Sequence, residues 1–411
     1  MKQYQIPTLE LEIRRAKIIE QMVENSTFVL FGAKNIVRNS DVEYPFRQTS
    51  NFWYLTGINQ PDSVLIIKKT DVVETNLYVL DKDKTKEIWH GKRLTKQEGM
   101  QNSGIENVFW LSELNWQKLE QTTTVYLEKP NDYFANSLVL DPNSIITSLR
   151  EKKSKWEIEQ MQIASKINCE AHIFAVKNHK VGNWEYQFEA DLLHFWKKNN
   201  LNWSYPPIVA SGSNATILHY ITNDKQCKDG DLLLVDAGCE VNYYASDITR
   251  CYPNNGKFSP AQAEIYQLVL DCNKKLINYL KAGISFVDYH KKSVEILTKG
   301  LIDLKILKTD LKTAIQNQEY TKFYMHGIGH WLGLDVHDLG TRFRDTVFEE
   351  GHCVTVEPGL YFDPNDESIP AKYRGIGIRI EDDIVITKTG VLNLTQHLPK
   401  EISEIENLMK L

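Results

Sequence analysis

The stretch that sets the tightest limits on this fold covers residues 229–250 and reads DGDLLLVDAGCEVNYYASDITR. Its apolar run has the length of a buried strand and ends in Asp236, and Asp247 follows in the next run. If the segment forms a strand, a turn and a returning strand, the two aspartates can face each other. Buried carboxylates repel, and a divalent cation compensates them best. Taken alone, the pattern favours the simpler interpretation that both lie in water at strand ends, because short motifs often match by chance.

Length and composition limit the class of protein. A chain of 411 residues predicts two or three domains, and its 42% apolar and 25% charged residues are typical of a soluble globular protein. The net charge of −6 and the lack of a basic stripe argue against a nucleic-acid partner. Six scattered cysteines without a CxxC pair indicate reduced thiols. With no apolar signal region and no run of membrane-spanning length, we expect a cytoplasmic protein without a membrane partner.

The first part of the chain predicts a smaller α/β N-terminal domain, because helical patterns alternate with strand-length apolar runs at 27–33, 62–69 and 76–83. The expected apolar face of an amphipathic helix over 8–23 consists of Leu9, Ile13, Ala16 and Ile18 or Ile19. Trp89 and His90 are closely flanked by charges, so we expect an exposed tryptophan on a loop that serves as a contact surface.

A polar stretch at 141–155 marks the domain boundary, and we place the domains at 1–150 and 151–411. Ser154 and Glu157 form a capping box for the next helix. Three further helices are predicted over 184–198, 259–281 and 287–301. The strands that carry the two aspartates lie between the first two of these helices. Helices that flank a largely antiparallel sheet predict an α+β domain.

The stretch MHGIGHWLGLDVHD, residues 325–338, contains His326, His330 and His337. The first two have the spacing of a zinc-protease helix, but Gly327 and Gly329 argue against a helix and no Glu follows His326. Glycines between histidines instead indicate a loop whose backbone comes close to another element. For any single histidine a polar or core role remains the simpler interpretation, and three within one short stretch weaken it.

Two further carboxylates end or interrupt apolar strands. CVTVEPG, residues 353–359, predicts a strand that ends in Glu357, where the following proline keeps the chain extended. GIGIRIEDDIVIT, residues 375–387, alternates so that Arg379 and Glu381 share one face. These two side chains form either a plain ion pair or a ligand that a neighbouring cation holds in place.

Together these patterns give four carboxylates and one imidazole: Asp236, Asp247, His330, Glu357 and Glu381. An oxygen-rich set with one nitrogen suits Mn²⁺, Mg²⁺ or Co²⁺, with Zn²⁺ as an alternative. Four anionic groups balance two divalent cations. Two metals about 3.5–4 Å apart can hold a bridging hydroxide and polarise a carbonyl at once. The joint pattern is much more specific than any single motif.

The motifs around these residues, VDAG, ASDITR, HGIGHWLG, TVEPGLY and GIRIEDD, resemble the five metal-ligand motifs of the pita-bread metallopeptidases. The similarity is closest to the aminopeptidase P family and covers almost the whole chain, because EYPFRQTSNFWYLTG (43–57) is similar to the N-terminal segment of that family. Methionine aminopeptidases lack such a domain, and creatinases share the fold but not the ligand set. The resemblance implies a C-terminal pita-bread domain of the creatinase/aminopeptidase type after a creatinase-like N-terminal domain.

The resemblance also implies a role for each ligand. Asp236 binds one metal, and Asp247 and Glu381 bridge the two. His330 and Glu357 bind the other metal, and Glu357 also acts as the acid/base. The metals are two divalent ions, with Mn²⁺ expected and Co²⁺ or Zn²⁺ as alternatives.

Around the metals, the resemblance implies that His219, His326 and His337 are catalytic and substrate-binding, with His337 donating to a substrate carbonyl and the other two walling the proline pocket. Arg379 is a catalytic residue behind the ligands, and Tyr361 binds substrate. A tryptophan of the first domain, here Trp89, reaches the active site of a neighbour in a homodimer or homotetramer.

The function that follows is hydrolysis of the N-terminal Xaa-Pro bond of peptides, with a metal-bridging hydroxide as nucleophile. Two alternatives remain open: an Xaa-Pro dipeptidase (prolidase), and a non-catalytic peptide-binding protein on the same fold. The loop at 341–351 departs from the family in length, which leaves open whether Arg342 or Arg344 contacts the substrate.

Overall fold

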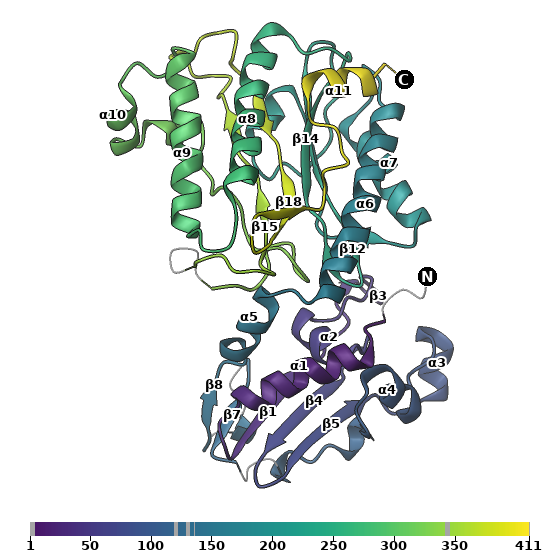
Figure 1. Ribbon diagram of the computed structural model, residues 1–411. Coiled ribbons are helices and arrows are strands. Elements are labelled where there is room, and N and C mark those ends of the chain that lie inside the picture. Colours follow the sequence, from purple (N-terminus) through teal and green to yellow (C-terminus); the bar gives the residue numbers. More distant parts are fainter. Residues whose placement is uncertain (1–4, 119–121, 129–131, 135, 342–345, 411) are drawn as a thin grey trace. The chain divides into compact units, whose positions relative to one another are not determined.

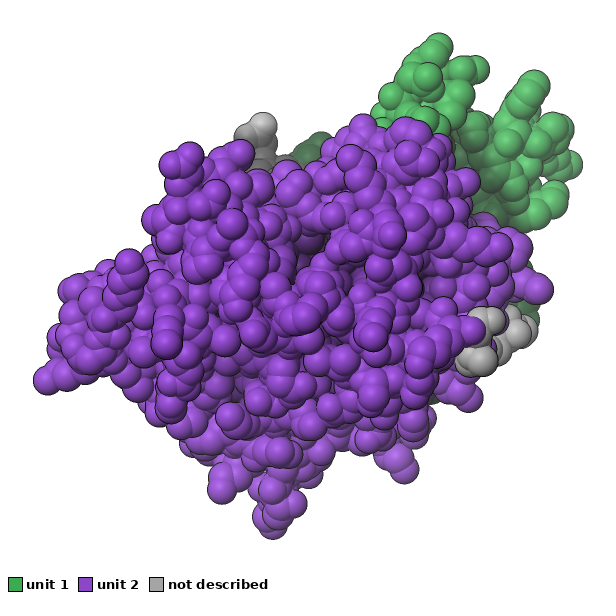
Figure 2. Space-filling view, turned by 90° about the horizontal axis from the view of Figure 1, so that it is seen from above, with its two compact units in different colours: residues 1–150 green, residues 151–411 purple. Residues whose placement is uncertain are grey.

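The computed structural model describes residues 5–118, 122–128, 132–134, 136–341 and 346–410. The chain forms two compact units, Met1–Arg150 and Glu151–Leu411, which Figures 1 and 2 show. Among the described helices, none is both long and apolar enough to cross a membrane. All six cysteines are buried and free.

Unit 1 is built on a mixed six-stranded sheet with the order β6-β5-β4-β1-β7-β8. Strand β1 pairs antiparallel with β4 and parallel with β7. The strands are β1 (Ser26–Phe31), β2 (Val37–Asn39), β3 (Val42–Glu43), β4 (Val64–Lys69), β5 (Val73–Val79), β6 (Asn107–Trp110), β7 (Thr124–Tyr126) and β8 (Leu138–Leu140). The helices are α1 (Thr8–Gln21), α2 (Ser50–Thr56), α3 (Lys84–His90), α4 (Lys96–Ser103) and α5 (Asn143–Glu151), and α1 crosses one face of the sheet (Figure 1).

The predicted buried face of the N-terminal helix is right at Ile18 and wrong at Leu9, Ile13 and Ala16. Leu9 and Ile13 are exposed, and the buried residues of α1 are Leu11, Arg14, Arg15 and Ile18. The reason is that both arginines donate to the last turn of α2, at the carbonyl oxygens of Tyr54 (3.1 Å) and Leu55 (2.8 Å). Their charged groups satisfy the helix end while their methylene stems cover apolar surface. A hydrophobic pattern alone assigns arginines to the outside.

Trp89 is exposed as predicted, with 80% of its surface accessible, but it lies on helix α3 and not on a loop. The helix forms because Asp83 caps it by accepting from the backbone N–H of Lys86 at 3.0 Å. Ile88 beside it is also 80% exposed, and no residue of α3 is buried. The charges that suggested a loop are therefore the solvated sides of a short surface helix.

Unit 2 contains four small sheets, and every strand pairing in its described part is antiparallel. The strands are β9 (Asn202–Trp203), β10 (Ile208–Ser211), β11 (Leu232–Ala237), β12 (Cys239–Val241), β13 (Tyr244–Ala245), β14 (Ile248–Pro253), β15 (Cys353–Val356), β16 (Gly359–Tyr361), β17 (Gly377–Arg379), β18 (Asp382–Ile386) and β19 (Val391–Asn393). The helices are α6 (Lys155–Asn178), α7 (Glu185–Lys198), α8 (Pro260–Tyr279), α9 (Phe286–Asp303), α10 (Leu311–Gln316) and α11 (Ile402–Leu408), with a short 3-10 turn η4 (Gly212–Thr216).

The long helices of unit 2 begin where the sequence predicts. Ser154 and Glu157 form the predicted capping box of α6. Ser259 and Gln262 cap α8 in the same way, with Pro260 at its first position. Helices α8 and α9 pack side by side, α8 also packs against β15, β16 and β17, and α6 packs against β12 and β13 (Figure 1). The predicted α+β arrangement of helices around antiparallel sheets is confirmed.

Candidate metal centre

A cavity of about 600 Å³ opens in unit 2. Nine of the predicted site residues line it: His219, Asp236, Asp247, His326, His330, His337, Glu357, Arg379 and Glu381. Tyr361 stands behind this lining, where its hydroxyl bonds both Arg379 Nη1 and His326 Nε2 at 2.9 Å. Trp89 belongs to unit 1, and Arg342 and Arg344 lie outside the described residues. The cavity thus gathers side chains from motifs that are far apart in the sequence.

The two aspartates come from the strand pair β11 and β14. Asp236 stands opposite Thr249, two residues beyond Asp247, so the aspartates are diagonal neighbours on one face and not direct partners. The residues between them form the separate strands β12 and β13. The hydroxyl of Tyr205 lies 2.6 Å from Asp236 Oδ1 and also reaches Asp247 Oδ1. One phenol therefore lies within hydrogen-bonding distance of both carboxylates.

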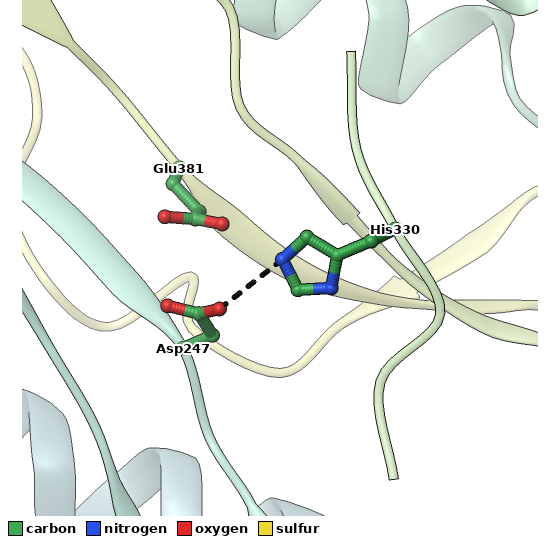
Figure 3. Close-up of side chains that lie close together, drawn as sticks. All are labelled: Asp247, His330 and Glu381. Atoms are coloured by element: carbon green, nitrogen blue, oxygen red, sulfur yellow. Dashed lines mark ion pairs between the residues drawn. The ribbon is translucent and has the colours of Figure 1, made fainter. Parts of the chain in front are cut away.

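His330 points its Nε2 atom at the carboxylates, 3.3 Å from Asp247 Oδ2 and 3.7 Å from Glu357 Oε1. Its Nδ1 atom donates to the carbonyl of Trp331 at 2.9 Å, so Nε2 is the ring atom that faces the carboxylates. Nε2 donates to Asp247 when it is protonated and can bind a metal when it is not. Ligand atoms of Asp247, His330 and Glu381 all lie within 4.8 Å of one another (Figure 3). These three side chains converge on one point that a metal ion can occupy.

The glycine-rich loop that carries His330 approaches strand β15 closely, as its sequence predicts. A Cβ atom on Gly329 would lie 2.1 Å from the carbonyl oxygen of Thr355, so no larger residue fits. The backbone N–H of His330 donates to Thr355 Oγ1 at 3.1 Å, and that hydroxyl lies 3.4 Å from Glu357 Oε1. Thr355 therefore sets the loop against the end of the strand that holds Glu357.

The run 375–387 is not one alternating strand but two strands in different sheets. Strand β17 pairs with β16, and β18 pairs with β15. Between them the N–H of Glu381 donates to the carbonyl of Thr249 at 3.1 Å. The chain changes sheets at this point, so simple alternation no longer places Arg379 and Glu381 on a shared face.

Arg379 forms its ion pair with Asp236, with Nη2 at 2.5 Å from Oδ2. Of the two interpretations left open for Arg379 and Glu381, the plain ion pair between them is therefore wrong. Its Nε atom donates to Thr249 Oγ1 at 3.1 Å. Glu381 instead accepts from that same Thr249 hydroxyl at 2.6 Å. The guanidinium of Arg379 thus orients Asp236, and the hydroxyl of Thr249 orients Glu381. The bond from Arg379 to Thr249 links the two pairs.

The cluster sets four carboxyl groups against two cationic side chains, Arg379 and His330. Burial raises the pKa of Glu357 to about 7, although His330 and Arg379 oppose the shift. Burial and the neighbouring carboxylates raise the pKa of Glu381 well above its usual range. Burial lowers the pKa of His330, but the hydrogen bond to Asp247 and the nearby carboxylate charges outweigh it and raise this pKa to about 9. Divalent cations fit this donor set, because they supply the missing positive charge.

The other histidines stand around the cluster. Burial lowers the pKa of His326 to about 3, so the ring is neutral, and it bonds Tyr361 and the carbonyl of Gly327. Burial also lowers the pKa of His337, whose ring centre lies 4.3 Å from that of His330. His219 is exposed on the cavity wall. Neutral imidazoles beside a cavity can donate hydrogen bonds without adding charge.

Sequence reasoning missed three residues of the site: Tyr205, Thr249 and Thr355. Tyr205 stands in SYPP, where nothing but the two prolines marks a fixed turn. Thr249 lies inside ASDITR, two residues after Asp247, and the period of a strand places it on the same face as that aspartate. Thr355 lies two residues before Glu357, and the same period identifies it. Strand period could therefore have predicted both threonines as site residues, whereas no pattern in the sequence predicts Tyr205.

The description of metallopeptidase family M24 matches residues 159–388, and that of the aminopeptidase P N-terminal domain matches residues 11–126. The Xaa-Pro aminopeptidase of Haemophilus influenzae is 42% identical, over 98% of both chains. The chain belongs to metallopeptidase family M24. In this chain the M24 domain follows an N-terminal domain of the aminopeptidase P type. As a metallopeptidase of this family, the protein is a hydrolase.

Solved structures agree with this family. The Xaa-Pro aminopeptidase of Escherichia coli is 39% identical over 98% of both chains. Its structure with the inhibitor Pro-Leu superposes with a TM-score of 0.95 at 39% identity, and the zinc-substituted form with product gives 0.94 at 38% identity. Both cover 99% of each chain. The fold of this M24 chain is therefore that of aminopeptidase P, with a pita-bread domain at its C-terminus.

Proposed function

We propose that this M24 chain is a metal-dependent aminopeptidase that removes the first residue of peptides with proline at the second position. The observation that carries the proposal is the convergence of Asp236, Asp247, His330, Glu357 and Glu381 on one cavity. The relatives named Xaa-Pro aminopeptidase match along nearly the whole chain, which supports the same substrate class. The complete set of carboxylates favours a catalytic metal site over a peptide-binding protein that has lost its ligands.

Those five residues would hold two divalent ions, for which we propose Mn²⁺, with Co²⁺ or Zn²⁺ as alternatives. When bound, such ions activate a water molecule and polarise the substrate carbonyl. Arg379 and Tyr205 hold Asp236 in place, and Thr249 holds Glu381. Partners of this kind orient ligands and tune metal affinity. The protein's own contribution is a set of carboxylates whose positions are already fixed.

Glu357 is the proposed acid/base. Its carboxylate lines the cavity, where an oxygen that no metal engages can take up and return a proton. We propose that Glu357 takes a proton from the attacking water and passes it to the leaving prolyl nitrogen. The nearest imidazole contacts of its oxygens are His330 and His326, each at 3.7 Å.

The surrounding residues would bind the peptide. His337 donates to the carbonyl oxygen of the scissile bond, where negative charge develops. His219 and His326 flank the proline ring, with Tyr361 holding the His326 ring at 2.9 Å. Arg379 is the catalytic-site cation that fixes Asp236. Apolar lining residues such as Leu218 and Ile221 complete a surface that suits an uncharged ring.

Assembly and location are proposals as well. Six buried free thiols suit a reducing compartment, so we propose a cytoplasmic enzyme. We also propose a homodimer or homotetramer in which Trp89, 80% exposed on α3, contacts a neighbouring copy. Sedimentation of the wild type and of Trp89→Ala tests the assembly.

The activity is tested with a peptide panel on stripped and metal-loaded protein. We expect a loaded sample to release the first residue of an Xaa-Pro-Yaa tripeptide and to leave Xaa-Ala-Yaa nearly uncut. Xaa-Pro dipeptides should be cut more slowly. A loaded enzyme that cleaves both tripeptides equally would contradict the proline preference, and full activity after stringent stripping would contradict metal dependence.

A further inference from the structure

The first turn of α7 holds a buried carboxylate that the proposed mechanism does not use. Glu185 is fully buried. Its Oε1 atom accepts from the N–H of Ser211 at 2.6 Å and from Asn214 Nδ2 at 3.0 Å. Its Oε2 atom accepts from the hydroxyl of Tyr220 and from the N–H of Lys225, both at 2.8 Å. Four donors fill the acceptor sites of this carboxylate.

All four donors lie on one segment, residues 211–225, and that segment forms a wall of the candidate active site. Leu218, His219 and Ile221 line the cavity. Residues 217–225 belong to no helix or strand, so no ladder of backbone hydrogen bonds fixes them. Side-chain hydrogen bonds hold this stretch instead, and Glu185 makes two of them, at Tyr220 and Lys225. Its other two bonds hold Ser211 at the end of β10 and Asn214 in η4.

The alternation around Tyr220 links this carboxylate to the cavity. His219 and Ile221 are exposed, whereas Tyr220 between them is buried and turns its hydroxyl to Glu185. One turn further along α7, Glu189 accepts from Asn223 Nδ2 at 2.9 Å. Helix α7 therefore contacts the wall through two carboxylates, Glu185 and Glu189, which lie four residues apart on one helical face.

We propose that Glu185 is a positioning residue of the aminopeptidase reaction, which fixes the 211–225 segment so that His219 and Ile221 present a rigid wall to the substrate. The inference rests on the proposed function. It concerns substrate binding more than the chemical step, because Glu185 touches neither the metal cluster residues nor Glu357 in its four described contacts. A wall that is no longer fixed weakens substrate binding, which raises KM more than it lowers kcat.

The test is Glu185→Gln, which keeps the size of the side chain and replaces one acceptor oxygen with a donor. We expect KM to rise about tenfold with kcat within about threefold of the wild type, and metal content to stay unchanged. Hydrogen exchange at the backbone amides of Ser211 and Lys225 should become faster, because both donate directly to Glu185. Tyr220→Phe removes one of the four bonds and should raise KM by a smaller factor.

The matched control is Val294→Ala on the buried face of α9, which lowers stability without altering the wall. An unchanged KM in both Glu185→Gln and Tyr220→Phe, or an equal rise in Val294→Ala, would overturn the inference. A wild type that cleaves no Xaa-Pro peptide would instead overturn the proposed function. In that case the exchange rates of the Ser211 and Lys225 amides still decide whether Glu185 fixes the segment.

Discussion

Two buried charged clusters lie back to back in unit 2, and they differ in how their charges are compensated. In the first, Asp382 is enclosed by Arg250 at 2.8 Å and Lys400 at 2.6 Å, and Thr395 donates to it at 2.8 Å. The second is the cavity cluster, in which Glu381 is the immediate neighbour of Asp382 along the chain. Its carboxylates share Arg379 and the imidazole of His330.

Charge balance separates the two roles more clearly than burial does. Burial alone would raise the pKa of Asp382, but Arg250 and Lys400 outweigh it and hold this pKa far below its usual range. For Glu381, burial and three carboxylates raise the pKa well above its range. A cluster whose carboxylate is paired with cationic side chains stabilises one arrangement of strands. A cluster whose carboxyl groups lack enough cationic partners favours the binding of metal ions. We infer that the second cluster is the site and the first is its scaffold.

The largest effect should come from breaking the uncompensated cluster. Asp247→Asn removes one carboxylate of the proposed ligand set, and we expect metal content to fall and kcat/KM to drop by more than about 100-fold, the upper range for residues that only orient ligands. Metal analysis and peptide kinetics on the same preparation measure both. Full activity in Asp247→Asn, or full metal loading, would contradict this assignment.

Neighbouring substitutions at positions 382 and 381 should have opposite effects on the metal-free protein. Asp382→Asn leaves Arg250 and Lys400 without their buried carboxylate and should destabilise unit 2 by about 3–5 kcal/mol. Glu381→Gln removes a carboxyl group whose ionisation is opposed by burial and by three neighbouring carboxylates, so it should stabilise the metal-free protein at neutral pH. Urea unfolding with a chelator present measures both, and two losses of equal size would refute the distinction.

Rising pH should destabilise the metal-free protein. A carboxyl with a raised folded-state pKa stabilises the fold below its ordinary pKa of 4.5, and for Glu357 this contribution is lost as pH rises to about 7. His330, raised from 6.5 to about 9, stabilises the fold below 6.5 and loses this contribution as pH rises through 9. Bound metal displaces both protons, so the loaded protein should be less sensitive. Thermal melts of stripped and loaded samples across this range should diverge, and parallel curves would contradict the expectation.

The sequence predicted which residues gather at the cavity but not the way the chain supports them. Carboxylates at the ends of apolar runs, such as Asp236 and Glu357, can be predicted from the sequence, because strand period and turn signals depend only on neighbouring residues. The break between Arg379 and Glu381 was not, since a change of sheet depends on which strands pair across long separations. The buried face of α1 failed for the same kind of reason, because Arg14 and Arg15 are buried through carbonyls supplied by a distant helix.

The smallest effect is expected at the far end of the substrate. A dipeptidase recognises the C-terminal carboxylate just past the scissile bond, which calls for a dedicated arginine or lysine. Among the described residues that line the cavity, Arg379 is the only such cation, and Asp236 already engages it.

Amidating the C-terminus of an Xaa-Pro-Yaa tripeptide should therefore change kcat/KM by about threefold or less, whereas losing a charge-assisted bond would cost on the order of tenfold or more. Arg342→Ala and Arg344→Ala test the two other arginines for which a substrate contact was left open. Both residues lie outside the described part of the chain. A strong preference for Xaa-Pro dipeptides that disappears on amidation, or in Arg344→Ala, would contradict the expectation. Such a result would show that a cation of the protein binds the C-terminal carboxylate of the substrate. It would place this M24 enzyme among the dipeptidases.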